Sequence, residues 1–185
     1  ERGITNIVVL EAKALGFGGT GRNGGPVMAG IGHDLDKIAR NVGPEGLQEI
    51  FKISSLGAKI IRDRIVKYGI DADFRKGYAY LAYNSRQDKT LRQWEMDFQT
   101  LDPDSEIRIV IGSGIKDVVG SDVYSSALLH MGCGHVHLLN LLLGEATALT
   151  TYGAQIFEDS PVLGVEYGDR VAVRTPTGTV RASKM

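Results

Sequence analysis

Cysteine is nearly missing from the sequence, which contains only Cys133. A single cysteine cannot form an internal disulfide framework, so the composition is typical of a reducing compartment and we expect a cytoplasmic protein. An excess of either charge is also missing, with 21 Lys and Arg against 22 Asp and Glu. A balanced chain has no electrostatic basis for binding nucleic acid or an anionic membrane.

Long apolar runs are missing as well. The longest near a helix, around Leu138–Leu143, is far shorter than the roughly 20 residues needed to cross a bilayer. The first residues, Glu-Arg-Gly, do not resemble a signal peptide. We therefore expect no membrane span and no secretion signal. With 185 residues and 43% hydrophobic content, the chain is expected to form one domain, or two small intertwined ones.

The hydrophobic pattern predicts a mixed α/β fold. The β-branched run Ile4–Leu10 is typical of a parallel strand buried on both faces. Further strands are expected at 72–76, 78–83, 125–131, 154–158, 162–167, 170–175 and 179–183. Helices are expected at 35–42, 44–68, 85–101 and 139–152. Asp34 is the expected N-cap of the first helix, and Ser85 with Asp88 resembles a capping box. Turns at Gly168-Asp169 and Thr177-Gly178 predict a final antiparallel meander.

Glu11 directly follows the predicted parallel strand. In a dinucleotide-binding βαβ unit, a carboxylate at this point accepts hydrogen bonds from the ribose of adenosine. The alternative is a solvated acid at a strand end. The usual G-x-G-x-x-G fingerprint would lie roughly 20 residues upstream, and the chain begins too late to contain it.

Glycine is concentrated in the segment after Glu11, with six glycines between Gly16 and Gly25. Ordering each one costs roughly 0.5–1 kcal/mol more than ordering alanine, so packing alone is a poor reason for them. Close approach to a ligand and plain flexibility remain as explanations. Thr20, Arg22 and Asn23 add a hydroxyl, a cation and an amide, which suit a pyrophosphate. Arg22 also has the simpler interpretation of a surface charge.

The run Val8–Ala12 followed by Gly16–Gly25 resembles the FAD-dependent amine and amino-acid oxidases of the D-amino-acid oxidase superfamily. The loop is similar to the G-F-G-A-S-G-R-N-G-G of members that oxidise γ-glutamylputrescine, with Gly19 and Thr20 in place of Ala and Ser. Further matches follow at 60–64, 134–137 and 171–178, whereas Leu138 replaces the usual Pro.

The resemblance implies a flavoenzyme that oxidises the C–N bond of a γ-glutamylated amine with oxygen as acceptor. It implies an α/β fold: a partial FAD-binding Rossmann-like domain, with the second and third parallel strands and a β-meander, at 1–70 and 132–185. Part of a mixed α+β substrate domain is expected at 71–131. The strand at 4–10 is expected to pair with 154–158. The implied FAD contacts are Glu11, Ala12, Gly18, Thr20, Gly21, Arg22, Asn23, Gly24, Gly25 and Val162.

Members of the family are about twice as long, so we expect this chain to be an inactive fragment that lacks the first βα unit and the C-terminal half. Its exposed sheet edge favours self-association. No catalytic residue is identified. The alternatives are a binding or assembly module without catalytic activity and an NAD-dependent dehydrogenase fragment. The second is disfavoured because the long loop has no role in that class.

Other reactive residues have simpler explanations. His135 and His137 would share one face of a strand, but no third ligand has a suitable spacing, so no metal site is predicted. Cys133 is expected to be a small buried residue. The tyrosines at 78, 80 and 83 are explained equally well by an amine pocket and by strand packing.

Overall fold

The chain folds into two compact units. The computed structural model describes residues 3–29 and 35–184. Unit 1 is formed by Glu1–Gly24, Lys67–Ala72 and His137–Met185, and unit 2 by Gly25–Val66 and Asp73–Val136. The expected division placed 25–66 with the FAD-binding part, whereas in the structure these residues pack with 73–136.

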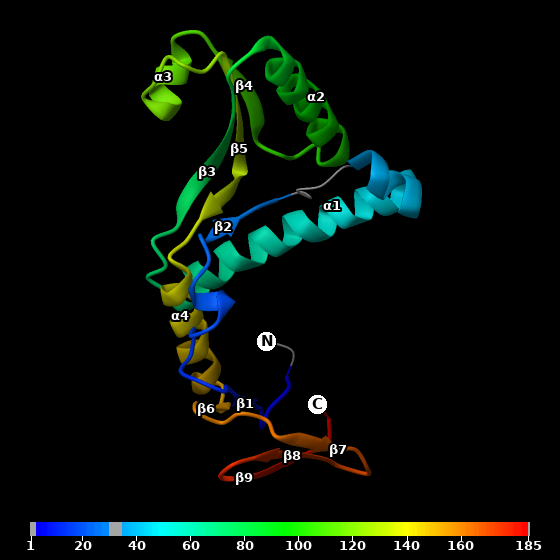
Figure 1. Cartoon of the computed structure of the whole chain (residues 1–185), viewed down its shortest axis with the longest axis vertical. Helices are drawn as coiled ribbons and strands as arrows, with labels where there is room; N and C mark the ends of the chain where they lie inside the picture. The colour runs from blue at the N-terminus through cyan, green and yellow to red at the C-terminus, as the bar shows by residue number, and fades with distance from the viewer. Residues whose placement is uncertain (1–2, 30–34, 185) are drawn as a thin grey trace. The chain divides into compact units, whose positions relative to one another are not determined.

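Unit 1 contains a parallel strand pair (Figure 1). β1 (Val8–Leu10) runs beside β6 (Gln155–Phe157), with Val9 opposite Ile156. The pairing implied by the family resemblance is thus confirmed. β1 is shorter than expected and is half-buried rather than fully enclosed.

The end of the chain forms an antiparallel meander of three strands. These are β7 (Gly164–Glu166), β8 (Val171–Thr175) and β9 (Gly178–Ala182). The first turn lies where the sequence predicts it, and the second is formed by Pro176 and Thr177, one residue earlier than expected. The strand expected at 154–158 is β6, which belongs to the parallel pair.

The long helix α1 (Leu35–Tyr68) has a kink at Gly43, where φ is 75°. This left-handed backbone suits glycine. Pro44 follows and lacks a backbone N–H, so it starts the second segment without losing a hydrogen bond. The two helices expected from the sequence are therefore continuous except at this kink. Gly69, with φ 60°, follows the end of α1. Asp34, the expected N-cap, lies outside the described residues.

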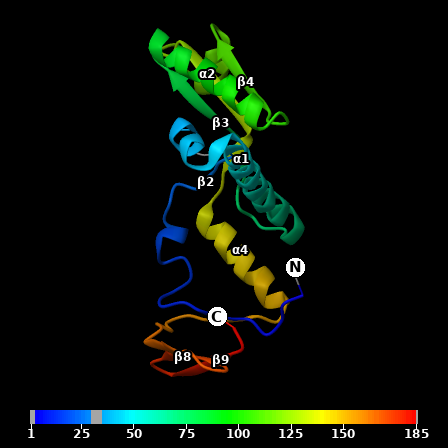
Figure 2. The same ribbon diagram turned by 90° about the vertical axis from the view of Figure 1, so that its right-hand side faces the viewer.

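Unit 2 is built around β5 (Ser126–His135). β3 (Arg75–Ala82) pairs antiparallel with one edge of β5, and β4 (Ile107–Ile111) and β2 (Pro26–Val27) pair with the other. α2 (Ser85–Leu101) covers one face of this sheet (Figure 2). The buried core combines α1, α2 and the sheet: Leu47, Phe51, Ala82, Leu91, Phe98, Ile107 and Leu128.

Three local expectations for unit 2 were wrong. The strands at 72–76 and 78–83 are one strand, β3, with a register irregularity between Lys76 and Tyr78. α2 is capped by Asn84, whose side chain accepts hydrogen bonds from the N–H groups of Arg86 and Gln87, and not by a box that begins at Ser85. β4 and the short helix α3 (Gly114–Val119) were not predicted.

Candidate functional site

The carboxyl ends of β1 and β6 are tied together by hydrogen bonds. The N–H of Glu11 donates to the carbonyl of Phe157 at 2.9 Å, and the N–H of Ser160 donates to the carbonyl of Glu11 at 2.8 Å. The N–H of Asp159 also donates to the carbonyl of Lys13. Since ligands of open α/β sheets bind beyond the carboxyl ends of parallel strands, this is where a nucleotide is expected.

Acidic side chains follow both parallel strands. The carboxylate of Glu11 accepts a hydrogen bond from the N–H of Lys13 at 2.9 Å. The carboxylate of Glu158 accepts one from the N–H of Leu15 at 2.5 Å. Sequence reasoning missed Glu158, although its position directly after β6 repeats that of Glu11 after β1. Glu158 fixes the start of the glycine-rich loop and Glu11 fixes the turn before it.

The glycine-rich loop contains one turn of 3-10 helix, η1 (Gly19–Gly21), where no regular structure was expected. The N–H of Arg22 donates to the carbonyl of Gly19 at 3.3 Å. The side-chain amide of Asn23 donates to the same carbonyl at 3.0 Å. The Arg22 guanidinium lies 4.3 Å from the centre of the Phe17 ring, a cation–π contact.

Three loop glycines lie where a Cβ atom would be crowded, and two of them, Gly21 and Gly25, would meet backbone atoms. A Cβ atom at Gly21 would overlap the carbonyl oxygen of Gly16. One at Gly16 would lie 2.6 Å from the Leu139 side chain, on α4 (Leu138–Thr151). A Cβ atom at Gly25 would overlap the carbonyl oxygen of Val136, and the φ of Gly25 is 75°. The conformation of the loop is therefore determined by contacts within the protein as well as by the backbone flexibility of glycine.

Gly18 and Gly19 behave differently from these three. A Cβ atom at either position would meet nothing within 4 Å, and both residues are exposed. Neither has a positive φ. Packing and backbone conformation in this structure therefore do not require glycine at 18 or 19, which leaves close approach by a ligand and chain flexibility as the reasons for it.

The predicted cofactor residues are divided between the units. Glu11, Ala12, Gly18, Thr20, Gly21, Arg22, Asn23, Gly24 and Val162 belong to unit 1, and Gly25 belongs to unit 2. Val162 lies two residues after Ser160, whose N–H is bound to Glu11, and is 47% exposed. Gly25 instead accepts a hydrogen bond from the N–H of Val136 at 2.9 Å. The structure thus brings the strand-end residues together and gives Gly25 a packing role.

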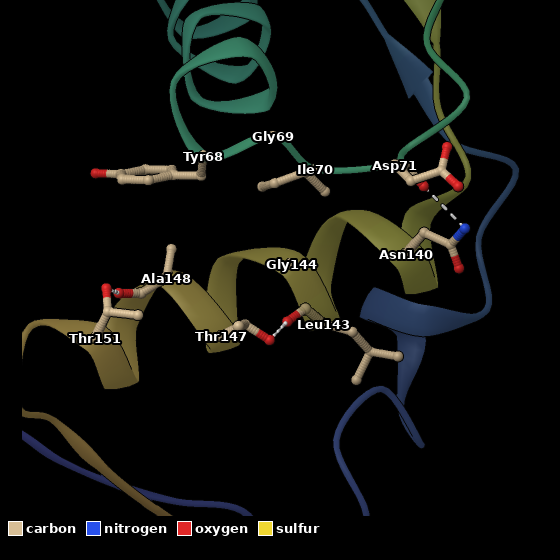
Figure 3. Close-up of a pocket in the computed structure, with 10 residues that line it drawn as sticks. All are labelled: Tyr68, Gly69, Ile70, Asp71, Asn140, Leu143, Gly144, Thr147, Ala148 and Thr151. Carbon is tan, nitrogen blue, oxygen red and sulfur yellow. Dashed lines mark hydrogen bonds between the residues drawn. The ribbon is translucent and has the colours of Figure 1, made fainter.

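A hollow of about 390 Å³ lies elsewhere in unit 1, between α4 and the segment Tyr68–Asp71 (Figure 3). The side-chain amide of Asn140 donates to the carbonyl of Asp71 at 2.9 Å. The hydroxyls of Thr147 and Thr151 are bound to backbone carbonyls of α4 itself. No predicted cofactor residue lines this hollow.

His135 and His137 lie on different elements. His135 ends β5, whereas the Nδ1 atom of His137 accepts from the N–H of Asn140 at the start of α4, so the two do not share a strand face. Among residues 3–29 and 35–184, no three His, Cys, Asp or Glu side chains are grouped so as to hold a metal ion. Within the same residues, no helix is long and apolar enough to span a membrane.

Cys133 is fully buried, as expected, and its sulfur accepts from the N–H of Ala29 at 3.2 Å. Burial raises the pKa of the thiol. A buried thiol with a raised pKa is a poor nucleophile, so Cys133 has no feature of a reactive cysteine.

A parallel strand pair with an acid at its carboxyl end and a glycine-rich loop after it defines an α/β protein with part of a Rossmann-like dinucleotide-binding fold. The chain belongs to the FAD dependent oxidoreductase family, which it matches over residues 1–184. The cofactor of this family is FAD. The family inferred from the residues around Glu11 is thereby confirmed.

Two curated relatives are each 35% identical to the chain. One is gamma-glutamylputrescine oxidoreductase of Escherichia coli K12, over 177 residues, and the other is the probable oxidoreductase OrdL of Haemophilus influenzae, over 175. These alignments cover 96% and 94% of this chain but 41% of each relative. A solved structure of L-amino acid deaminase from Proteus myxofaciens is 20% identical and superimposes with a TM-score of 0.77, covering 96% of this chain and 38% of that protein. This likeness shows a shared fold.

Proposed function

We propose that the chain is the part of a flavin-dependent amine oxidoreductase that holds the adenosine and pyrophosphate of FAD. One observation carries this proposal. The acid that ends β1, Glu11, lies at the carboxyl end of a parallel strand pair, in the same compact unit as the exposed residues Gly18 and Gly19.

The residues of unit 1 fit the parts of the cofactor. The Glu11 carboxylate accepts hydrogen bonds and suits the hydroxyls of the adenosine ribose. The loop supplies N–H donors and a cation, which suit the pyrophosphate and the flavin side. Its residues are Thr20, Arg22, Asn23 and Gly24, which are exposed, and Gly21, which is half-buried. The backbone at Val162 is tied through Ser160 to the Glu11 strand end and suits the adenine.

The proposed substrate is a γ-glutamylated amine with oxygen as electron acceptor. The proposal rests on the 35% identity to the Escherichia coli relative named for gamma-glutamylputrescine. Bound FAD would supply hydride abstraction from the carbon beside the amine. The residues of this chain position the cofactor for that chemistry. Because the chain spans 41% of that relative, we expect the 185-residue polypeptide alone to have negligible oxidase activity.

The test compares two polypeptides, the 185-residue chain and the full-length protein that contains it. The full-length protein is expected to be yellow as purified and to release peroxide with γ-glutamylputrescine. Putrescine, which lacks the glutamyl group, is the matched control, and the rate of peroxide release with it is expected to be at least about tenfold lower. A colourless full-length protein, or equal rates with both amines, would contradict the cofactor or the substrate assignment respectively.

A further inference from the structure

Unit 2 contains a hollow of about 410 Å³ between β3 and α2, away from every residue proposed to hold FAD. Its lining is formed by Tyr78, Ala79, Tyr80, Leu81, Gln87, Thr90, Leu91 and Trp94. No side chain in this set carries a charge at neutral pH. Three of the eight are aromatic, although aromatic residues make up only 7% of the sequence.

The three aromatic rings meet at steep angles. The ring centres of Tyr78 and Tyr80 are 5.0 Å apart with an interplanar angle of 62°. Those of Tyr80 and Trp94 are 5.4 Å apart at 76°. Both pairs are therefore edge-to-face contacts, and the faces of the three rings point in different directions. Tyr78 is 40% exposed and Trp94 is 37% exposed, so a small molecule can reach the rings from solvent.

The polar groups of the hollow can both accept and donate hydrogen bonds, because the Gln87 side-chain oxygen accepts from the N–H of Tyr83 and its amide N–H groups remain as donors. The Thr90 hydroxyl donates to the carbonyl of Arg86, which leaves its lone pairs to accept. Burial raises the pKa of Tyr80 to about 12, so its hydroxyl stays neutral and the attraction for a cation comes from the ring faces. An anion would find no positive group in the lining. An alkylammonium ion combines an apolar surface, a positive charge and, when primary, N–H donors.

We propose that the hollow lined by Tyr78, Tyr80 and Trp94 binds a small alkylammonium ion by cation–π contact. The site shares no residue with the proposed FAD contacts, and its binding test requires neither FAD nor oxidase activity. Two kinds of ligand have this chemistry, primary amines and quaternary ammonium compounds, and they can be distinguished by direct titration.

The sequence provides an internal probe, because Trp94 is the only tryptophan. The tryptophan fluorescence of the 185-residue chain is recorded during separate titrations with tetramethylammonium chloride and putrescine dihydrochloride. Sodium chloride keeps the ionic strength constant, and tert-butanol serves as a neutral molecule of similar size. We expect a saturable change with at least one cation, with a Kd on the order of 1 mM, and no saturation with tert-butanol. Saturation with putrescine indicates a primary amine ligand, and saturation with tetramethylammonium alone indicates a quaternary one.

Two substitutions separate binding from folding. Tyr78→Leu removes an exposed ring and is expected to weaken the cation response at least about fivefold, whereas Tyr78→Phe keeps the ring and the response. Tyr83→Leu is the matched control, because Tyr83 is 59% exposed at the end of the same segment but does not line the hollow. Circular dichroism checks that each variant is folded. No saturable response to either cation, an equal response to tert-butanol, or full binding by Tyr78→Leu would overturn the proposal.

Discussion

The main chain at Gly21 passes so close to the carbonyl oxygen of Gly16 that a Cβ atom at position 21 would overlap it. The loop proposed to bind the pyrophosphate is thus closed on itself by two glycines. Both lie in unit 1, where Gly16 also packs against Leu139 of α4.

Gly21→Ala is expected to open this contact and to lower the free energy of unfolding by about 1–3 kcal/mol, a typical cost of overpacking. Gly19→Ala is the matched control, since a Cβ atom there meets nothing within 4 Å, and it is expected to change stability by less than about 0.5 kcal/mol. Urea unfolding midpoints compare the two variants. Equal midpoints would show that the crossing of Gly16 and Gly21 does not constrain the loop.

Glu11→Gln in the full-length protein is expected to weaken FAD binding about 10- to 100-fold. A hydrogen bond to a charged group contributes about 1.5–3 kcal/mol, and the amide retains only part of it. Quenching of flavin fluorescence gives the Kd. The control is Glu49→Gln, which removes an exposed carboxylate paired with Lys52 in unit 2. The ribose assignment fails if both variants bind FAD as the unchanged protein does.

His130 is expected to make stability depend on pH. Burial lowers the pKa of its imidazole below the ordinary value of 6.5, so the folded state binds its proton less readily than the unfolded state. The free energy of unfolding therefore falls as the pH drops through about 6.5. Urea midpoints at pH 7.5 and 5.5 measure this loss, and His130→Gln is expected to reduce it. An identical pH dependence in the variant would assign the loss to other groups.

Cys133 is expected to react with a thiol reagent at least about 100-fold more slowly in the folded chain than in urea. Its sulfur is buried and its pKa is raised by burial, so reaction requires local opening of unit 2. Because it is the only cysteine, the absorbance of the released reagent reports this site alone. Rapid reaction in native buffer would show that the strand end around Cys133 opens readily.

The position of Glu11 at the end of a parallel strand was more predictable than the tertiary arrangement around it. It could be predicted because a β-branched run followed by an acid is a local pattern. The pairing of the strand before Glu11 with 154–158 was predicted from the family resemblance, since nothing near Glu11 specifies a partner so far along the chain. The roles of Gly16 and Gly21 could not be predicted, because each depends on an atom brought close only by folding.

The errors in unit 2 have similar causes. Ile107–Ile111 is a β-branched run, but it is short and lies between polar and glycine-rich segments. It is a strand because it pairs with β5, and this pairing could not be read from the local sequence. Residues 25–66 follow the predicted cofactor loop directly in sequence. Their packing with unit 2 is decided by side chains such as Phe51, whose ring lies 5.7 Å from that of Phe98.

The pairing of Val9 with Ile156 also determines when unit 1 can form. On a ribosome, β1 is made before unit 2 and β6 is made after it, so these two strands cannot pair until unit 2 has been synthesised. Contacts between such distant segments carry a large loop-closure cost and form slowly. Unit 2 can gain its core beforehand, because its last segment ends at Val136. The pairing of β1 with β6 therefore follows the synthesis of unit 2, and the interval before it is the stage at which chaperones would have the greatest effect on this strand pair.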